Sequence, residues 1–231
     1  YSLGVGVLGT DITLEGPFKK NYGGSYLFNY RYSSLAMLDQ LHLVDFDGVP
    51  KYQDATFKLH LPTRKYGTFS LFGIGGDSHI YEKAPESEES ERIAYRTDYG
   101  AIVGTIGLNH VLTLNENSIL KLSLSASNNG SDYYQEVADS AEAFSFSGKG
   151  NWNKSVLRAA VTWNTKLNAR NRLVAGLNYA SFFYDMTEHY YDAGLDRNVT
   201  GIDLTRNAGM TQGYVSWKYR LNNNLTLVSG L

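Results

Sequence analysis

Residues 120–127 read Leu-Lys-Leu-Ser-Leu-Ser-Ala-Ser, so apolar and polar side chains alternate at every position. Successive side chains of an extended strand point to opposite faces. Leu120, Leu122 and Leu124 therefore share one face, and the lysine and serines share the other. The same alternation recurs at residues 25–32, 57–61, 157–167 and 215–221. This period of two predicts two-faced antiparallel strands, because strands of a parallel sheet are buried on both faces and apolar throughout.

The composition of the 231-residue chain fits a strand-rich protein with many aromatic side chains, with 18 Tyr and 23 Gly but only 4 Pro. The chain contains no cysteine, which excludes disulfide frameworks, thiolate zinc sites and cysteine nucleophiles. Its net charge of −2 provides no basic field for a nucleic-acid partner. No apolar run approaches the roughly 18 residues of a membrane-spanning helix.

Two kinds of connection alternate along the chain. Short polar turns are expected at residues 17–24, 63–67, 113–118, 168–172 and 222–224. Long polar or acidic connections are expected at residues 34–52, 83–92, 128–153 and 185–207. This pattern predicts a meander of about ten antiparallel strands, with the tight turns at one end and the long loops at the other. The meander forms one unit over residues 1–231.

Alternation also occurs in soluble β-sandwiches, so three further features are needed to choose a fold. The strands look long, and many exceed the ~9–11 residues that cross a bilayer at a tilt, whereas globular strands average near 5–6. The loops are asymmetric, as in outer-membrane barrels. Amphipathic rings that suit a membrane interface concentrate toward strand ends: Tyr22, Tyr26, Tyr66, Trp163, Tyr179, Tyr184, Trp217 and Tyr219. We therefore predict an all-β, antiparallel up-and-down transmembrane β-barrel, with a soluble β domain as the alternative.

In such a barrel the two faces of each strand meet different environments. The side chains expected to face lipid are Leu120, Leu122, Leu124, Leu157, Val161, Trp163, Val215 and Trp217. Those expected to face an aqueous or protein-filled lumen are Lys121, Ser123, Arg158, Thr162, Asn164, Lys218 and Arg220.

Three segments near the start of the chain carry a family resemblance. Residues 8–20 read Leu-Gly-Thr-Asp-Ile-Thr-Leu-Glu-Gly-Pro-Phe-Lys-Lys, residues 25–33 read Ser-Tyr-Leu-Phe-Asn-Tyr-Arg-Tyr-Ser, and residues 48–55 read Gly-Val-Pro-Lys-Tyr-Gln-Asp-Ala. Together they resemble the barrel of TonB-dependent outer-membrane receptors, of the type with an N-terminal carboxypeptidase-regulatory-like domain. The specific part of the resemblance covers about residues 8–76, and the remainder resembles generic barrel hairpins.

The resemblance implies a 22-stranded barrel whose lumen holds a plug domain. At roughly 23 residues per strand, such a barrel needs about 500 residues before the plug is added. We therefore expect residues 1–231 to be a partial outer-membrane barrel domain, with the plug upstream and absent from this chain. A complete small barrel of about ten strands is the alternative.

The function that the resemblance implies is active uptake of a nutrient ligand across a Gram-negative outer membrane. The implied partners are outer-membrane lipids, the plug domain and the TonB energy-coupling system, with a surface lipoprotein as a further candidate. A small complete barrel, porin-like or structural, is the alternative function, and an outer-membrane enzyme is less favoured.

No catalytic, cofactor or metal site is predicted, because no hydrolase, P-loop or zinc-helix motif occurs and the five histidines are scattered. The local cluster that most resembles a catalytic group is Glu188-His189 with Asp185 and Asp192, and a polar loop is favoured there. Two acidic sets do not fit a calcium loop: Asp45 and Asp47, and Asp192, Asp196 and Asp203. The run at residues 86–91 is expected to be a solvated loop tip.

Aromatic side chains on the long-loop side are the candidate ligand-binding residues, because exposed rings stack on sugars or contact apolar cargo. The candidates are Tyr133, Tyr134, Trp152, Tyr190 and Tyr191. Phe144 and Phe146 lie in the same stretch of sequence, and mutual packing between adjacent loops is the alternative for all of these rings.

Overall fold

A computed structural model describes residues 1–6, 9–33, 48, 50–85 and 93–231. The described residues form eleven strands: β1 (Ser2–Val5), β2 (Thr10–Pro17), β3 (Ser25–Tyr32), β4 (Lys51–Pro62), β5 (Thr68–Pro85), β6 (Ile93–Asn115), β7 (Ser118–Ala138), β8 (Phe144–Lys166), β9 (Asn171–Asp192), β10 (Arg197–Arg220) and β11 (Thr226–Gly230). No described segment forms a helix that is long and apolar enough to span a membrane.

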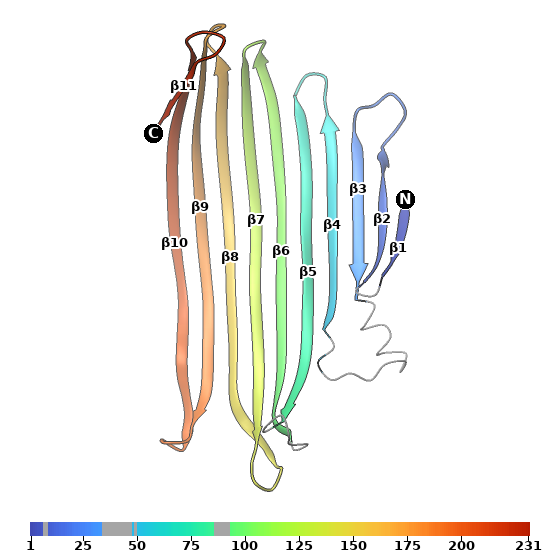
Figure 1. The fold of residues 1–231 in the computed structure, drawn as a ribbon, viewed down its shortest axis with the longest axis vertical. Coiled ribbons are helices and arrows are strands. Elements are labelled where there is room, and N and C mark those ends of the chain that lie inside the picture. The colour runs from blue at the N-terminus through green and yellow to red at the C-terminus, as the bar shows by residue number, and fades with distance from the viewer. Residues whose placement is uncertain (7–8, 34–47, 49, 86–92) are drawn as a thin grey trace.

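The strands form a single antiparallel sheet in which each strand pairs with its neighbours in sequence, from β1 to β11 (Figure 1). The β2–β3, β4–β5, β6–β7, β8–β9 and β10–β11 turns all lie at one end of the sheet (Figure 1). We call this the short-turn end, and the opposite end the far end. The meander that the sequence predicts is confirmed.

Two of the predicted long connections are wrong. Residues 128–153 and 185–207 are mostly strand, because β7 continues to Ala138 and β9 to Asp192. Only residues 139–143 and 193–196 connect the strands there. These strand ends are polar on both faces, so their sequence resembles a loop although their backbone stays paired. The other two predicted connections, and the acidic run at 86–91, lie wholly or partly outside the described residues.

The register of the sheet shows that the strands are staggered. One row of directly paired residues joins Pro17 of β2 to Gln212 of β10: Pro17, Ser25, His60, Ser70, Asn109, Ser123, Ala160, Asn178 and Gln212. Pro17 is the last residue of β2, whereas Gln212 lies eight residues (220 − 212) before the end of β10. The turns thus advance by about one residue per strand. A strand rises ~3.3 Å per residue and neighbouring strands lie ~4.8 Å apart. The stagger therefore corresponds to strands tilted by roughly 35° from the axis of a barrel, which is within the range found in closed barrels.

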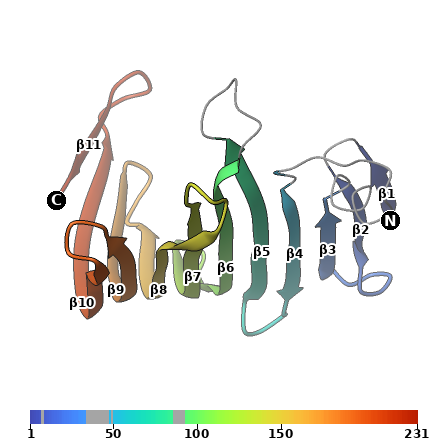
Figure 2. The same ribbon diagram turned by 90° about the horizontal axis from the view of Figure 1, so that it is seen from below.

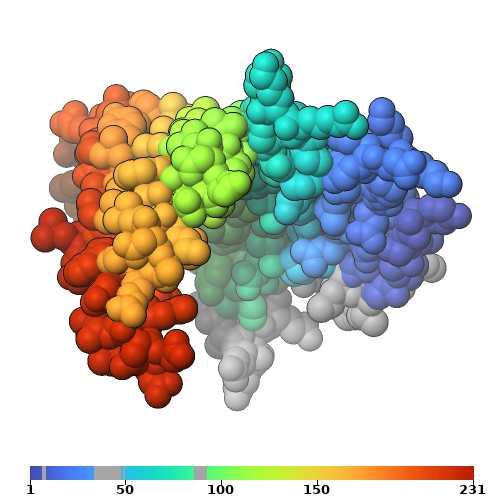
Figure 3. Space-filling model, turned by 90° about the horizontal axis from the view of Figure 1, so that it is seen from above, coloured from blue at the N-terminus to red at the C-terminus, as the bar shows by residue number. Residues whose placement is uncertain are grey.

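The described strands stand in one layer, with no second sheet or helix over either face (Figure 2). In the space-filling view the colours follow the order of the chain from one side of the molecule to the other (Figure 3). Leu124 and Leu157 are consequently 55% and 51% exposed. The accessible surface is 15886 Å², whereas a compact soluble monomer of this mass exposes roughly 10,400 Å². Val156 and Ala180 are the only buried apolar side chains among the described residues. The described residues lack the core of a soluble β domain, which contradicts that alternative.

Direct pairing also fixes which residues share a face. Leu122 pairs with Val161, and Val161 with Leu177, whereas Ser123 pairs with Ala160. We call the side of Leu122 the apolar face and the side of Ser123 the polar face. The two predicted sets, lipid-facing and lumen-facing, lie on these opposite faces as expected.

The apolar face is apolar only in a band next to the short-turn end. On β7 the band runs from Leu120 to Ala126, and the same face then bears Asn128 and Asp132. On β8 it runs from Trp163 back to Leu157, followed toward the far end by serine and asparagine. A membrane strand needs ~9–11 residues, and β6 to β10 contain 21 to 24. About half of each strand therefore extends past the apolar band.

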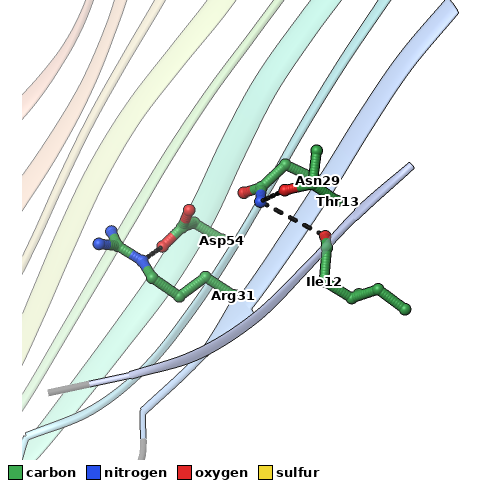
Figure 4. Close-up of polar contacts among 5 residues, drawn as sticks. All are labelled: Ile12, Thr13, Asn29, Arg31 and Asp54. Atoms are coloured by element: carbon green, nitrogen blue, oxygen red, sulfur yellow. Dashed lines mark hydrogen bonds and ion pairs between the residues drawn. The ribbon is translucent and has the colours of Figure 1, made fainter. Parts of the chain in front are cut away.

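Polar contacts on the opposite face join the first strands. The Asn29 side-chain amide on β3 donates to the Thr13 hydroxyl at 2.8 Å and to the Ile12 carbonyl at 3.3 Å (Figure 4). The Arg31 guanidinium pairs with Asp54 of β4 at 2.7 Å (Figure 4). These side-chain bonds on the polar face stabilise the register in which β2, β3 and β4 pair.

Candidate functional site

Aromatic rings and two cations gather on the polar face of β7, β8 and β9. We call this group the aromatic–cation surface, and it consists of Tyr133, Trp152, Lys154, Arg158, Phe182, Tyr184 and Glu188. Alternation places every second residue of β8 and β9 on this face, and the register brings the three strands together. Arg158 lies on the polar face at the level where the apolar band ends on the opposite face. The rest of the surface extends from there toward the far end of the sheet.

The rings of Tyr133 and Trp152 stack with their centroids 5.3 Å apart and their planes 15° from parallel. Both rings lie over Gly150, where an added Cβ would come within 2.5 Å of each. The missing side chain thus lets two large rings lie flat on the sheet backbone, as aromatic rings do over strand glycines elsewhere.

The Tyr133 hydroxyl donates a hydrogen bond of 3.3 Å to a carboxylate oxygen of Glu188, although β8 separates their strands. Partial burial, and then the negative charge and hydrogen bond of Glu188, raise the pKa of Tyr133 above its ordinary value. Tyr133 lies beyond the apolar band, outside the part of β7 that the band covers.

The two cations of the surface contact ring faces. The Lys154 ammonium lies 5.4 Å from the centroid of Phe182 and 5.5 Å from that of Tyr184. The Arg158 guanidinium lies 5.9 Å from Phe182. Neither cation has a carboxylate within ion-pair distance among the described residues. Rings and unpaired cations together can hold a ligand that presents a flat face and a negative charge.

The structure divides the five aromatic residues predicted to bind ligand. Tyr133 and Trp152 come together, and Tyr190 lies on the same face with its ring against Gly201. Tyr134 and Tyr191 point to the other side, where Tyr134 packs with Phe146 and Tyr191 donates to Asp196. Whether any of them contacts a ligand stays a prediction.

Sequence reasoning missed the role of Lys154, Phe182 and Tyr184. Tyr184 was expected at a strand end in a lipid interface, but it lies inside β9 on the polar face, opposite Lys154. Tyr184 is two residues from Phe182 and four residues from Glu188 along the strand. This period of two is the signal that would have placed Tyr184 on the same face as those residues. In contrast, Trp163, Trp217 and Tyr219 lie on the apolar face near the short-turn end, with Trp217 and Tyr219 stacked at 5.5 Å.

The other candidate clusters are dispersed. Glu188 is on the polar face, whereas His189 is on the opposite face and contacts Thr200. Asp192 accepts hydrogen bonds from the amides of its own turn. In the described part of the chain, no three histidine or acidic side chains converge as a metal site, and Asp45 and Asp47 lie outside it.

Comparison with known proteins gives likeness in structure alone. No family model matches the sequence, and no curated protein resembles it. The fold matches the crystal structure of the ferric yersiniabactin uptake receptor FyuA from Yersinia pestis with a TM-score of 0.62 and 13% identity, over 93% of this chain and 35% of that one. It also matches the copper transporter OprC with a TM-score of 0.57 and 12% identity, over 96% of this chain and 35% of OprC.

Both matched proteins are TonB-dependent receptors. The chain spans about a third of the length of each. Its all-β antiparallel sheet thus has the fold of a stretch of such a barrel, and the predicted fold class is confirmed.

Proposed function

We propose that residues 1–231 form part of the barrel wall of a TonB-dependent receptor, which takes up a nutrient ligand across a Gram-negative outer membrane. The observation that carries the proposal is the uncovered apolar band on a sheet whose register advances about one residue per strand. Its likeness to the barrels of FyuA and OprC supports the same role.

The membrane explains the exposed leucines. In lipid, backbone polar groups must be paired and a sheet must close, whereas apolar side chains need no protein cover. The Trp217 indole on the apolar face donates to Asn171 at the short-turn end, at 2.9 Å. Such amphipathic rings suit the boundary between lipid and water.

The rest of the proposed receptor lies beyond this sheet. The described edge strands β1 and β11 each pair on one side only. We propose that further strands close the sheet, about 22 in all, as the family resemblance implies. We propose a plug domain in the lumen, coupling to TonB, outer-membrane lipids around the band and a surface lipoprotein as a further partner. The segments at residues 8–20 and 25–33 support the type with an N-terminal carboxypeptidase-regulatory-like domain.

The aromatic–cation surface is the proposed place of ligand contact on this wall. It faces the side opposite the apolar band and offers stacked rings beside unpaired cations. Among the five predicted aromatics, Tyr133, Trp152 and Tyr190 lie on this side, so we assign ligand contact to them first.

Uptake measurements test the proposal. Cells with and without the gene are given a panel of labelled ferric chelates, cobalamin, oligosaccharides and peptides. We expect saturable uptake of one class that requires the gene and stops when a protonophore collapses the inner-membrane proton gradient. Uptake that persists with the protonophore would indicate a passive channel instead, and conversion of a compound at the cell surface would indicate an enzyme.

A matched pair of variants tests the site. We expect Trp152→Ala to raise the ligand concentration at half-maximal uptake by about two- to twelvefold, because one stacked ring contributes ~0.5–1.5 kcal/mol. Trp163→Ala removes the same side chain from the apolar face and should leave this concentration unchanged. Equal effects of the two variants would contradict the assignment.

A further inference from the structure

A row of three cations crosses the polar face at the short-turn end. Lys166 of β8 pairs directly with Arg172 of β9, and Arg172 pairs directly with Lys218 of β10. Like charges directly opposite each other on one face of a sheet destabilise it. The row therefore has an electrostatic cost that a neighbouring negative charge would remove.

Two further cations extend the row toward the rim. Arg220 is the last residue of β10, and its backbone amide donates to the Arg170 carbonyl at 2.8 Å. All five cations are exposed and line one cavity of about 390 Å³. Asn164, which accepts a 2.7 Å hydrogen bond from Arg172, lines it as well.

The described residues do not neutralise this cavity. Glu116 is the single acidic side chain in its lining, and none of the five cations is within ion-pair distance of a carboxylate in the described ranges. The whole chain carries a net charge of −2, so the positive cluster is local to this end.

We propose that this cavity, the basic seat formed by Lys166, Arg170, Arg172, Lys218 and Arg220, binds an acidic segment of another polypeptide that approaches from the short-turn end. The seat lies on the polar face, opposite the apolar band, so the head groups of lipids around the band do not reach it. Arg170 lies in the turn itself, so the seat opens past the ends of the strands.

The spacing of the cations favours several carboxylates over a single small anion. Neighbours in the row are separated by the strand spacing of ~4.8 Å, and Arg220 lies two residues, ~6.6 Å, further along its strand. Alternate side chains of an extended acidic peptide are also ~6.6 Å apart. The side-chain amides of Asn115, Asn117 and Asn164, which line the cavity, can bond the backbone of such a peptide.

The test measures binding of fluorescein-labelled octaglutamate by anisotropy to the intact protein, purified in a neutral detergent at low salt. The triple variant Lys166→Gln, Arg172→Gln, Lys218→Gln is compared with the control Lys58→Gln, Lys121→Gln, Arg206→Gln. The control removes the same charge from the same face, away from the seat. We expect affinity to fall about tenfold in the seat variant, the sum of three exposed charge pairs, and less than twofold in the control.

Thermal unfolding provides a second readout that does not depend on the fluorescent label, because a bound peptide stabilises the folded state. Octaglutamate should raise the unfolding midpoint of the wild type and of the control variant but not that of the seat variant. Without peptide, the seat variant should unfold at or above the wild-type temperature, because its repulsive row has been removed. A lower midpoint without peptide would overturn the argument from like-charge repulsion.

Other outcomes also overturn the proposal. Equal loss of peptide affinity in both variants would mean nonspecific attraction, and no binding to the wild type would mean that the seat is closed to an added segment. Displacement of the peptide by an equal charge concentration of inorganic phosphate would mean a site for small anions. Binding to phosphatidylglycerol vesicles that depends on the seat, without peptide binding, would mean a lipid site.

Discussion

The hydroxyl oxygens of Thr162 and Tyr214 lie 2.9 Å apart, although β9 separates their strands. The contact crosses Gly176, which pairs directly with both residues. A Cβ on Gly176 would overlap the ring of Tyr214, so the glycine provides the space through which the two side chains meet.

Gly176→Ala should therefore displace the Tyr214 ring and break this hydrogen bond. We expect a loss of about 1–3 kcal/mol in the free energy of unfolding, typical of overpacking. Gly213→Ala is the matched control on the adjacent strand, since its Cβ would meet Leu177 at 3.9 Å and the Gly176 carbonyl oxygen at 4.0 Å, both ordinary contacts. Unfolding in detergent measures both, and equal losses would refute the role of Gly176.

The two faces should respond differently to a charge. Leu122→Arg places a cation in the apolar band and should cost ~2–4 kcal/mol in a lipid-embedded barrel. Ser123→Arg places the same cation on the polar face and should cost at most the Ser123–Asn109 hydrogen bond, about 1 kcal/mol. Urea unfolding in lipid vesicles compares the two, and equal tolerance would contradict the assignment of the faces.

The Tyr133–Glu188 contact predicts a pH dependence. Because the pKa of Tyr133 is raised in the folded chain, the contact stabilises the fold below the unfolded tyrosine pKa of about 10. This stability is lost as the pH rises through the folded pKa. Glu188→Gln should lower the pKa of Tyr133 without restoring its ordinary value, since burial remains.

NMR of chains carrying ¹³C-labelled tyrosine measures the pKa of Tyr133, and Tyr133→Phe identifies its signal. An unchanged Tyr133 pKa in Glu188→Gln would show that the carboxylate does not act on the phenol.

The ends of the sheet should lie on opposite sides of the membrane. The chain has no cysteine, so labelling by a thiol reagent reports only the cysteine that is introduced. We expect Ala141→Cys, at the far end, to react with a membrane-impermeant maleimide in intact cells. Ala169→Cys, at the short-turn end, should react only after the outer membrane is permeabilised. Labelling of both in intact cells would contradict this orientation.

The sequence by itself determined the antiparallel meander and its two faces. Alternation is a local property, because each residue of a strand points opposite to the one before it. Leu122 and Ser123 could therefore be assigned to opposite faces without knowledge of their partners. The short turns were also read correctly, since polar residues interrupt the alternation there.

Only the tertiary structure decided which side chains meet and where the strands end. Tyr133 and Glu188 are 55 positions apart and Thr162 and Tyr214 are 52 apart, so their contacts depend on a register fixed by every intervening pair. The polar halves of β7 and β9 resemble loops because polar side chains lie on both of their faces, yet backbone pairing keeps them extended. The basic seat has the same origin, because Lys166, Arg172 and Lys218 are brought into one row by the pairing of three strands.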